Sequence, residues 1–369
     1  MDKNNEMQKP TLLLIIDTLK KGGAETLLVG ILRQLNVKFE VILVTLSAEC
    51  DFDEDEIICR ARYNLGFKRK MSLVSSVLKL KKIIKNHAPV LVHSHLVYSS
   101  IVARCACLQS MPVLYSIHGE LSKNDFNKSK ILTFIERNTI RKNHSLIAVS
   151  DAALTDYKKT IFKTYKTFIL PNFIADQYFE QSIIRDFAAI KSLNLVSIGN
   201  FKAAKNYEYL IEAFRYLKEY PVSLKIYGNI NNPTYSQLQS EIQRDELNIV
   251  LKGPLENVQE ELSNNDLFVM SSRNEGFGMA AVEAMASGLP LLLSNLPVFH
   301  EVTFDNAVFF DITTPTSFAT LIKEIFEGKY NLNQLSVKGF EIAKQYNKEK
   351  YLSNLYSIYD EILSGRILK

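Results

Sequence analysis

Short apolar runs of strand length alternate with helical patterns along the first half of the chain. Residues 11–17 fit a buried strand, 24–35 a helix with apolar residues at helical spacing, and 39–47 a second strand. Three further strand-like runs end in polar residues, at 89–96, 112–120 and 144–151. This alternation is typical of parallel sheets covered by helices, so it predicts an α/β fold.

The same alternation restarts after residues 168–174. Strands are predicted, each followed by a helical pattern, at 193–200, 222–229, 248–253 and 266–272. With roughly 150 residues per domain, 369 residues fit two domains. We therefore expect one doubly wound domain over 1–171 and a second over 172–345, with Pro171 and Asn172 in the linker. A last helix within 346–369 is expected to fold back on the first domain.

Composition excludes several protein classes. Hydrophobic residues make up 47% and charged residues 23%, which describes a globular chain rather than a disordered or fibrous one. The polar start and the short run Leu12–Ile16, stopped by Asp17, fit neither a signal peptide nor a membrane span. Four cysteines without a CxxC pair agree with a reducing compartment. The predicted location is the cytoplasm.

Positive charge is concentrated in residues 67–87, which contain seven Lys or Arg and no acid. Leu73, Val77, Leu80 and Ile84 recur there at helical spacing, so the segment is predicted to be a basic amphipathic helix. It fits the solvated surface helix of an α/β domain, or a helix drawn to an anionic membrane surface, where each basic residue contributes about 1 kcal/mol. Aromatic residues for base stacking are missing, which argues against nucleic acid.

Polar residues follow several predicted strands of the first half. In open α/β sheets, ligands bind at the carboxyl ends of the strands, and Asp17, His95 and His118 fall at that edge. His93, His95 and His118 would need a carboxylate or cysteine at suitable spacing to complete a metal site, and none is found. No metal is expected.

Residues 273–290 hold two glutamates among small residues. Gly276 and Gly278 flank the start of a predicted helix, where free backbone N–H groups and the helix dipole favour an anion such as phosphate. Glu283, one turn into the helix, is an ionised carboxylate able to accept hydrogen bonds from sugar hydroxyls, and Glu275 in the turn does likewise. An anion site between two hydroxyl acceptors is the outline of a sugar nucleotide site.

The segment EGFGMAAVE, residues 275–283, resembles the E-x7-E motif of family-four retaining glycosyltransferases with the GT-B fold. Other segments of the family's pattern follow in the expected order over nearly the whole chain: GGAE, HSH, SIHGE, IAVSD, LPNFI, SIGNFKAAKNYEYLIEAF and SNLPVFHEV. The resemblance implies two Rossmann-like domains facing each other across a cleft, with the acceptor on the first and the nucleotide-sugar donor on the second.

The resemblance also implies roles for individual residues. His118 would lie beside the transferred sugar, Lys205 on the phosphates and Glu275 on the sugar hydroxyls. Glu283 would bind the ribose, and the diphosphate would contact the remaining donor residues Gly22, Gly23, Gly276, Phe277, Gly278 and Met279. The reaction would keep the anomeric configuration, with a UDP-sugar or GDP-sugar as substrate and no cofactor. A lipid-linked or surface-polysaccharide glycan would be the acceptor, at the inner membrane face.

One departure keeps other functions open. The family usually has an arginine after the glycine that closes the strand, and this chain has Asn200 after Gly199. Asn200 is expected at this donor-binding position, and Lys202, three residues after the glycine, is the candidate substitute for the arginine on the donor. Arginine grips two phosphate oxygens, whereas lysine acts as a point charge and asparagine carries no charge. This favours the alternative of a catalytically silent GT-B protein that binds sugar, nucleotide or a partner enzyme. A sugar-nucleotide epimerase is a second alternative, but it needs acidic and histidine residues that are missing here.

Overall fold

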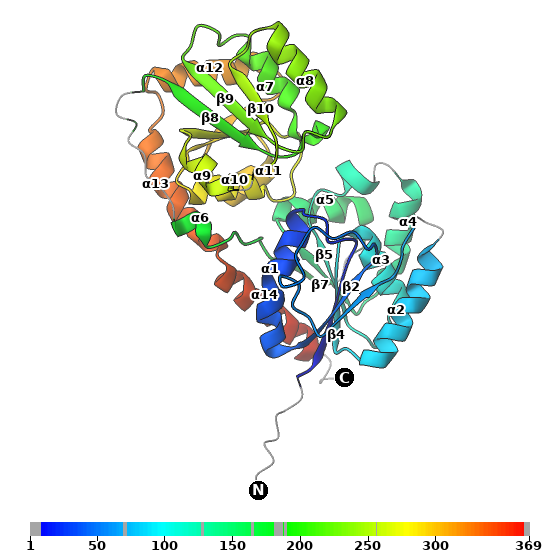
Figure 1. Cartoon of the computed structure of the whole chain (residues 1–369). Coiled ribbons are helices and arrows are strands. Elements are labelled where there is room, and N and C mark those ends of the chain that lie inside the picture. Colours follow the sequence, from blue (N-terminus) through cyan, green and yellow to red (C-terminus); the bar gives the residue numbers. More distant parts are fainter. Residues whose placement is uncertain are drawn as a thin grey trace. The chain divides into compact units, whose positions relative to one another are not determined.

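The chain divides into two compact units. The computed structural model describes residues 9–364, apart from 69–71, 127–128, 164–165, 181–186, 188–189 and 256. The first unit comprises Met1–Pro171 and Tyr351–Lys369, and the second comprises Asn172–Lys350 (Figure 1). Each unit has its own parallel sheet and its own apolar core. The predicted α/β fold with two doubly wound sheets is confirmed.

The first unit is built on a seven-stranded parallel sheet in the order β3-β2-β1-β4-β5-β6-β7. The strands are β1 (Thr11–Ile16), β2 (Glu40–Thr45), β3 (Ala61–Asn64), β4 (Leu91–His95), β5 (Val113–Ile117), β6 (His144–Ala148) and β7 (Lys166–Ile169). Central strands such as β1 are apolar at nearly every position because helices cover both faces. In Figure 1, α1 (Gly23–Lys38) and α14 (Lys348–Ser364) lie on one side of the strands. The helices α2 (Leu73–His87), α3 (Val97–Ala106) and α4 (Lys130–Thr139) lie on the other.

The second unit is built on a six-stranded parallel sheet in the order β10-β9-β8-β11-β12-β13. The strands are β8 (Leu193–Ile198), β9 (Val222–Tyr227), β10 (Ile249–Lys252), β11 (Leu267–Met270), β12 (Leu291–Ser294) and β13 (Val308–Phe310). One side of the sheet carries α7 (Tyr207–Phe214), α8 (Pro233–Arg244) and α12 (Pro315–Phe326) (Figure 1). The other carries α9 (Val258–Ser263), α10 (Met279–Ala286) and α11 (Pro297–Thr303), and α13 (Leu332–Ala343) packs against α10.

Four strands have no counterpart among the strands predicted from the sequence. The edge strands β3 and β7 are four residues long and only partly buried, so they lack a clear apolar run. The short strands β12 and β13 follow residues 273–290 in the chain. Pairing with a neighbouring strand therefore defines β3 and β7 more than their own residue pattern does, whereas β12 has a fully buried apolar run that the sequence analysis did not assign to a strand.

The C-terminal helix α14 packs on the first unit from Tyr351 onwards. The Tyr356 hydroxyl donates to the Gln34 carbonyl at 2.9 Å, and Tyr359 contacts Phe39 edge to face. Residues 346–350 were expected to belong to this segment, but they stay with the second unit. Tyr346 is attached to the second unit, because its hydroxyl donates to the Val302 carbonyl at 2.9 Å.

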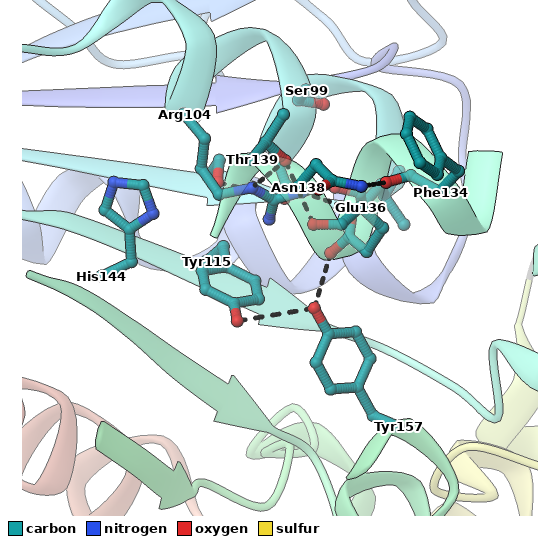
Figure 2. Close-up of polar contacts among 12 residues, drawn as sticks. Ser99, Arg104, Tyr115, Phe134, Glu136, Asn138, Thr139, His144 and Tyr157 are labelled. Carbon is teal, nitrogen blue, oxygen red and sulfur yellow. Dashed lines mark hydrogen bonds and ion pairs between the residues drawn. The ribbon is translucent and has the colours of Figure 1, made fainter. Parts of the chain in front are cut away.

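A buried ion pair joins α3 to α4 (Figure 2). Arg104 pairs with Glu136, and their side chains are 0% and 3% exposed. Arg104 Nε donates to Thr139 Oγ1 at 3.1 Å, and its guanidinium lies 4.7 Å from the centre of the Tyr115 ring. Tyr157 donates to the second Glu136 oxygen at 2.6 Å. Burial and the Glu136 charge raise the pKa of Tyr157, so it remains a donor. Nothing in the sequence pattern indicated this network.

Candidate functional site

Two loops meet at the carboxyl edge of the second sheet. One follows β8 and the other follows β11, and these strands are neighbours in the sheet. The backbone N–H of Arg273 donates to the Ala204 carbonyl at 2.8 Å, and the Ser271 hydroxyl donates to the Lys205 carbonyl at 3.0 Å. Ligands bind at such an edge in open α/β sheets, so these loops form the candidate site.

Lys205 and Glu275 form an ion pair between the two loops. The ammonium lies 2.6 Å from Glu275 Oε1, and the side chains are 21% and 14% exposed. Ser272 donates to the same carboxylate oxygen at 2.8 Å. An ammonium has three N–H donors, so Lys205 can hold Glu275 and still contact a second anion. The structure thus brings together the two residues that the resemblance assigns to the phosphates and the sugar.

Two glycines allow the first loop to take its path. A Cβ on Gly228, which follows β9, would lie 2.4 Å from the Gly199 carbonyl oxygen. A Cβ on Gly199 would lie 2.8 Å from Lys205 Cε. The Gly228 contact is with backbone and cannot be relieved by a rotamer change. Glycine here keeps β8, β9 and the Lys205 side chain in close approach.

The helix α10 begins one residue after Gly278. Gly278 has a φ of +84°, and a Cβ there would meet Phe299 Cε1 at 2.7 Å. Phe277 precedes it and packs edge to face on Tyr346 at 5.4 Å. The start of the helix was predicted between Gly276 and Gly278, but the helix starts at Met279, because left-handed Gly278 forms the N-cap. The first backbone N–H groups of α10, which in a helix lack intrahelical carbonyl partners, lie at the end of the second loop.

Glu283 lies on α10 in a partly buried position. Burial raises the pKa of this carboxyl from 4.5 to about 7, and the charge of Lys205 opposes the rise. Glu283 was expected to be ionised, but with a pKa of about 7 its carboxyl is only partly ionised near neutral pH. Tyr178, on α6 (Gln177–Glu180), is a neighbour the sequence did not point to: burial and the Glu283 charge raise the pKa of its phenol.

Asn200 replaces the family's arginine and has a structural contact. Its exposed side-chain oxygen accepts a hydrogen bond from the Asn229 backbone N–H at 3.2 Å, which links the ends of β8 and β9. Lys202 and Arg273 are exposed on the two loops that form the candidate site. Arg273 was not singled out from the sequence. Lys202 and Arg273 therefore supply positive charge near the candidate site, which the neutral Asn200 does not.

The remaining predicted residues belong to the first unit. Gly22 and Gly23 lie at the start of α1, and a Cβ on Gly23 would meet no other atom within 4 Å. Packing inside the protein therefore does not require glycine at position 23.

His118 directly follows β5, where its Nε2 lies 3.2 Å from His95 Nδ1. Among the described residues, no group of three or more His, Cys, Asp or Glu side chains is placed to hold a metal ion.

The chain is similar to known glycosyltransferases along most of its length. Residues 21–178 match the family model "Glycosyltransferase Family 4", and residues 182–341 match "Glycosyl transferases group 1". The putative glycosyltransferase EpsF of Bacillus subtilis is 26% identical over 314 residues, which cover 79% of this chain and 80% of EpsF.

Two further proteins extend the comparison. The UDP-Gal:alpha-D-GlcNAc-diphosphoundecaprenol alpha-1,3-galactosyltransferase of Escherichia coli is 24% identical over 349 residues, which cover 86% of this chain and 89% of that enzyme. The crystal structure of Anabaena Alr3699/HepE in complex with UDP and glucose shares the fold, with a TM-score of 0.80 at 17% identity. It covers 95% of this chain and 100% of that chain. The chain is therefore a family-four-like glycosyltransferase with a GT-B fold.

Proposed function

We propose that this protein is a retaining hexosyltransferase that takes its sugar from a UDP-sugar or GDP-sugar and needs no metal. The observation that carries the proposal is the Lys205–Glu275 pair, held between the loops after β8 and β11, with α10 and Glu283 following the second loop. A diphosphate would contact Lys205 and the first N–H groups of α10. Glu275 would hold the sugar and Glu283 the ribose.

In the proposed reaction, these residues stabilise the charge that develops as the bond to the sugar breaks. Breaking the bond to the anomeric carbon builds positive charge on the sugar and negative charge on the departing diphosphate. Lys205 and the N-terminus of α10 are donors suited to that negative charge. The departing phosphate oxygen can itself accept the acceptor's proton on the same face of the sugar, which keeps the anomeric configuration. In the first unit, we propose that His118 lies beside the transferred sugar and that the Gly22–Gly23 turn contacts the diphosphate; a Cβ on Gly23 would meet no atom within 4 Å.

The comparisons support a glycan acceptor. One relative is named for transfer of galactose onto a diphosphoundecaprenol-linked sugar, and HepE was crystallised with UDP and glucose. We propose a lipid-linked or surface-polysaccharide acceptor, used at the cytoplasmic face of the membrane. Asn200 favours a second candidate, a GT-B protein that binds a nucleotide or sugar without turnover, because the arginine usual at this position is lost.

The raised pKa of Glu283 gives a test of the donor site. If the ionised carboxylate binds the ribose hydroxyls, only the ionised fraction of the protein is competent. With a pKa of about 7, nucleotide affinity should be about tenfold weaker at pH 6 than at pH 8. Calorimetric titration of the wild type with the best-binding nucleoside diphosphate measures this. Glu283→Gln is the matched control, because any change of its affinity with pH reports the ligand's own phosphate.

The same substitution has an expected effect on stability. A carboxyl whose pKa is raised from 4.5 to about 7 stabilises the fold at low pH and loses that contribution as the pH rises through this interval. Glu283→Gln should therefore bind nucleotide more weakly but raise the Tm at pH 8. Equal changes of affinity with pH in wild type and Glu283→Gln would show that Glu283 does not bind the ribose.

We also propose that α2 and α4 attach the protein to an anionic membrane surface. Val74 and Leu78, one turn apart on α2, are 70% and 60% exposed, and Ile131 and Phe134 on α4 are 63% and 67% exposed. Both helices contact α3 and cover the same side of the sheet (Figure 1). The exposed lysines of α2 are Lys79, Lys81, Lys82 and Lys85. The basic residues Arg69 and Lys70 lie outside the described residues. Among the described residues, no helix combines the length and apolar character needed to cross a bilayer.

Vesicle flotation tests this attachment. The wild type should float with phosphatidylglycerol vesicles at low salt and be released at high salt, because exposed charges are screened. Lys81→Glu/Lys82→Glu should weaken binding by 10-fold or more, at about 1 kcal/mol for each lysine lost. The control is Lys218→Glu/Lys338→Glu, which makes the same change of charge at exposed lysines of the second unit. Equal loss in both variants would mean that α2 is not the attachment surface.

A further inference from the structure

Three histidine rings lie next to one another on one side of the first sheet. His93 and His95 alternate with Ser94 along β4, so both point to the same side, and His118 follows the neighbouring strand β5. The ring centres of His93 and His95 are 4.3 Å apart, and those of His95 and His118 are 5.4 Å apart. The proposed function assigns a role to His118 and none to the other two.

His93 is the fixed end of the three rings. Its Nδ1 lies 2.7 Å from the Tyr359 hydroxyl of α14, and its Nε2 lies 2.8 Å from the Ser116 hydroxyl of β5. Both ring nitrogens therefore have partners, which holds the ring in one orientation. The His95 ring lies against this fixed ring at an interplanar angle of 33°.

His95 and His118 form a hydrogen-bonded pair whose outer nitrogens have no partner in the described part of the protein. His95 Nδ1 lies 3.2 Å from His118 Nε2. His95 Nε2 and His118 Nδ1 are both buried and unpaired, and His95 is 1% exposed. A buried polar atom without a hydrogen bond costs about 1–3 kcal/mol, so a ligand group that reaches these atoms would gain that contribution.

Both rings of the pair are neutral. Burial lowers the pKa of His118 to about 4 and the pKa of His95 well below its usual range. A neutral imidazole carries one N–H. If His95 donates from Nδ1, then His118 carries its proton on Nδ1 and His95 Nε2 is bare; if His118 donates, the assignments reverse. One outer nitrogen is therefore a donor and the other an acceptor, and each determines the other.

The backbone beside His95 is held tightly. Leu96 has a φ of +71° and a ψ of 172°, a region that residues other than glycine rarely adopt. Its N–H donates to the Ser116 carbonyl at 3.3 Å, and Asp17 accepts the Ser99 backbone N–H at 2.8 Å. These contacts fix the turn that connects β4 to α3. Strain of this kind is concentrated at functional sites.

We propose that His95 is a positioning residue for sugar transfer. Its hydrogen bond couples the tautomer of His118 to its own. In the proposed site one of the two coupled arrangements is populated, so that His118 Nδ1 meets a sugar hydroxyl as a fixed donor or a fixed acceptor. The inference rests on the proposed function, in which His118 lies beside the transferred sugar. His93 keeps the His95 ring in place from the other side.

The tautomer can be measured without any assay of activity. The chain has six histidines, so selective ¹⁵N labelling of histidine gives a spectrum simple enough to assign by single substitutions. In the wild type, His118 should show one protonated and one bare nitrogen. His95→Leu should shift both His118 resonances towards averaged values, because nothing then selects the tautomer. His95→Asn keeps a donor and an acceptor near the position of Nδ1 and should restore the single-tautomer pattern.

Kinetics with a UDP-hexose or GDP-hexose provide the second readout. His95→Leu should lower kcat roughly 10- to 100-fold with little change in donor KM, a loss of the size found when a group that orients a metal-ligating histidine is removed. His95→Asn should recover most of the rate. The control is His144→Leu, which removes an equally buried histidine from the start of β6, away from this edge of the sheet.

The outcomes separate this inference from the proposed function. An unchanged His118 spectrum in His95→Leu overturns the inference, whatever the activity. A changed spectrum with an unchanged kcat also overturns it, and if His118→Ala is inactive in the same assay the proposed function stands. If His118→Ala also has full activity, the assigned role of His118 fails together with the inference. Averaged resonances with a lowered kcat, both reversed in His95→Asn, support it.

Discussion

Replacing Lys205 by alanine is expected to lower kcat by about 10²–10³-fold, the usual loss when one donor to a developing negative charge is removed. Lys205 is a partly buried ammonium held 2.6 Å from Glu275. In the proposed reaction it contacts the diphosphate as the bond to the sugar breaks. Its contribution is therefore greatest in the transition state, and kcat should fall more than donor binding. Steady-state release of the nucleotide from a matching donor sugar measures this.

Two further variants separate charge from geometry. Lys205→Arg keeps the positive charge but changes its shape, so it should recover only part of the rate. Lys218→Ala removes an exposed lysine of the second unit, beyond the end of α7, and should have the wild-type rate. The assigned role of Lys205 would be wrong if Lys205→Ala turned over as fast as Lys218→Ala.

Leucine in place of either Arg104 or Glu136 is expected to lower the free energy of unfolding of the first unit by about 3–5 kcal/mol. Each single substitution leaves the other charge buried, since the two side chains are 0% and 3% exposed (Figure 2). The double variant Arg104→Leu/Glu136→Leu leaves no buried charge. It should therefore be more stable than the sum of the two single losses predicts. Denaturant unfolding of the four proteins measures the coupling.

The exposed pair Lys20–Glu49 provides the matched control. Its side chains are 57% and 55% exposed, and such surface pairs contribute about 0–1 kcal/mol. Lys20→Leu should therefore change stability little. An Arg104→Leu protein as stable as Lys20→Leu would contradict the account of the buried pair. Nucleotide binding by the second unit checks that this unit remains folded in every variant.

The sequence predicted the parts of the fold that carry a strong local pattern. The five buried residues of β1 form a continuous apolar run, and Gly278 and Gly288 mark the two ends of α10. The edge strands β3 and β7 lack such a pattern because solvent reaches part of each strand. Their identity depends on pairing with a neighbour, which a local pattern does not encode.

Residue types at the candidate site were visible in the sequence, but their contacts were not. Lys205 and Glu275 are 70 positions apart, and they meet only because β8 and β11 are adjacent. The raised pKa of Glu283 depends on how deeply the folded unit buries its carboxyl, and the residue pattern of α10 alone does not determine this. Arg104 lies in an apolar helix pattern that gives no sign of its partner in α4, and the bond from His95 to His118 joins two separate strand ends.

The central claim is the transfer of a hexose from a nucleotide sugar without inversion and without a metal. The most direct measurement is proton NMR of UDP-hexoses and GDP-hexoses incubated with the protein and membrane lipid extract in the presence of a chelator. We expect that one donor is consumed and that the first product has the donor's anomeric configuration. An inverted product, or no turnover of any donor by folded protein, would contradict it.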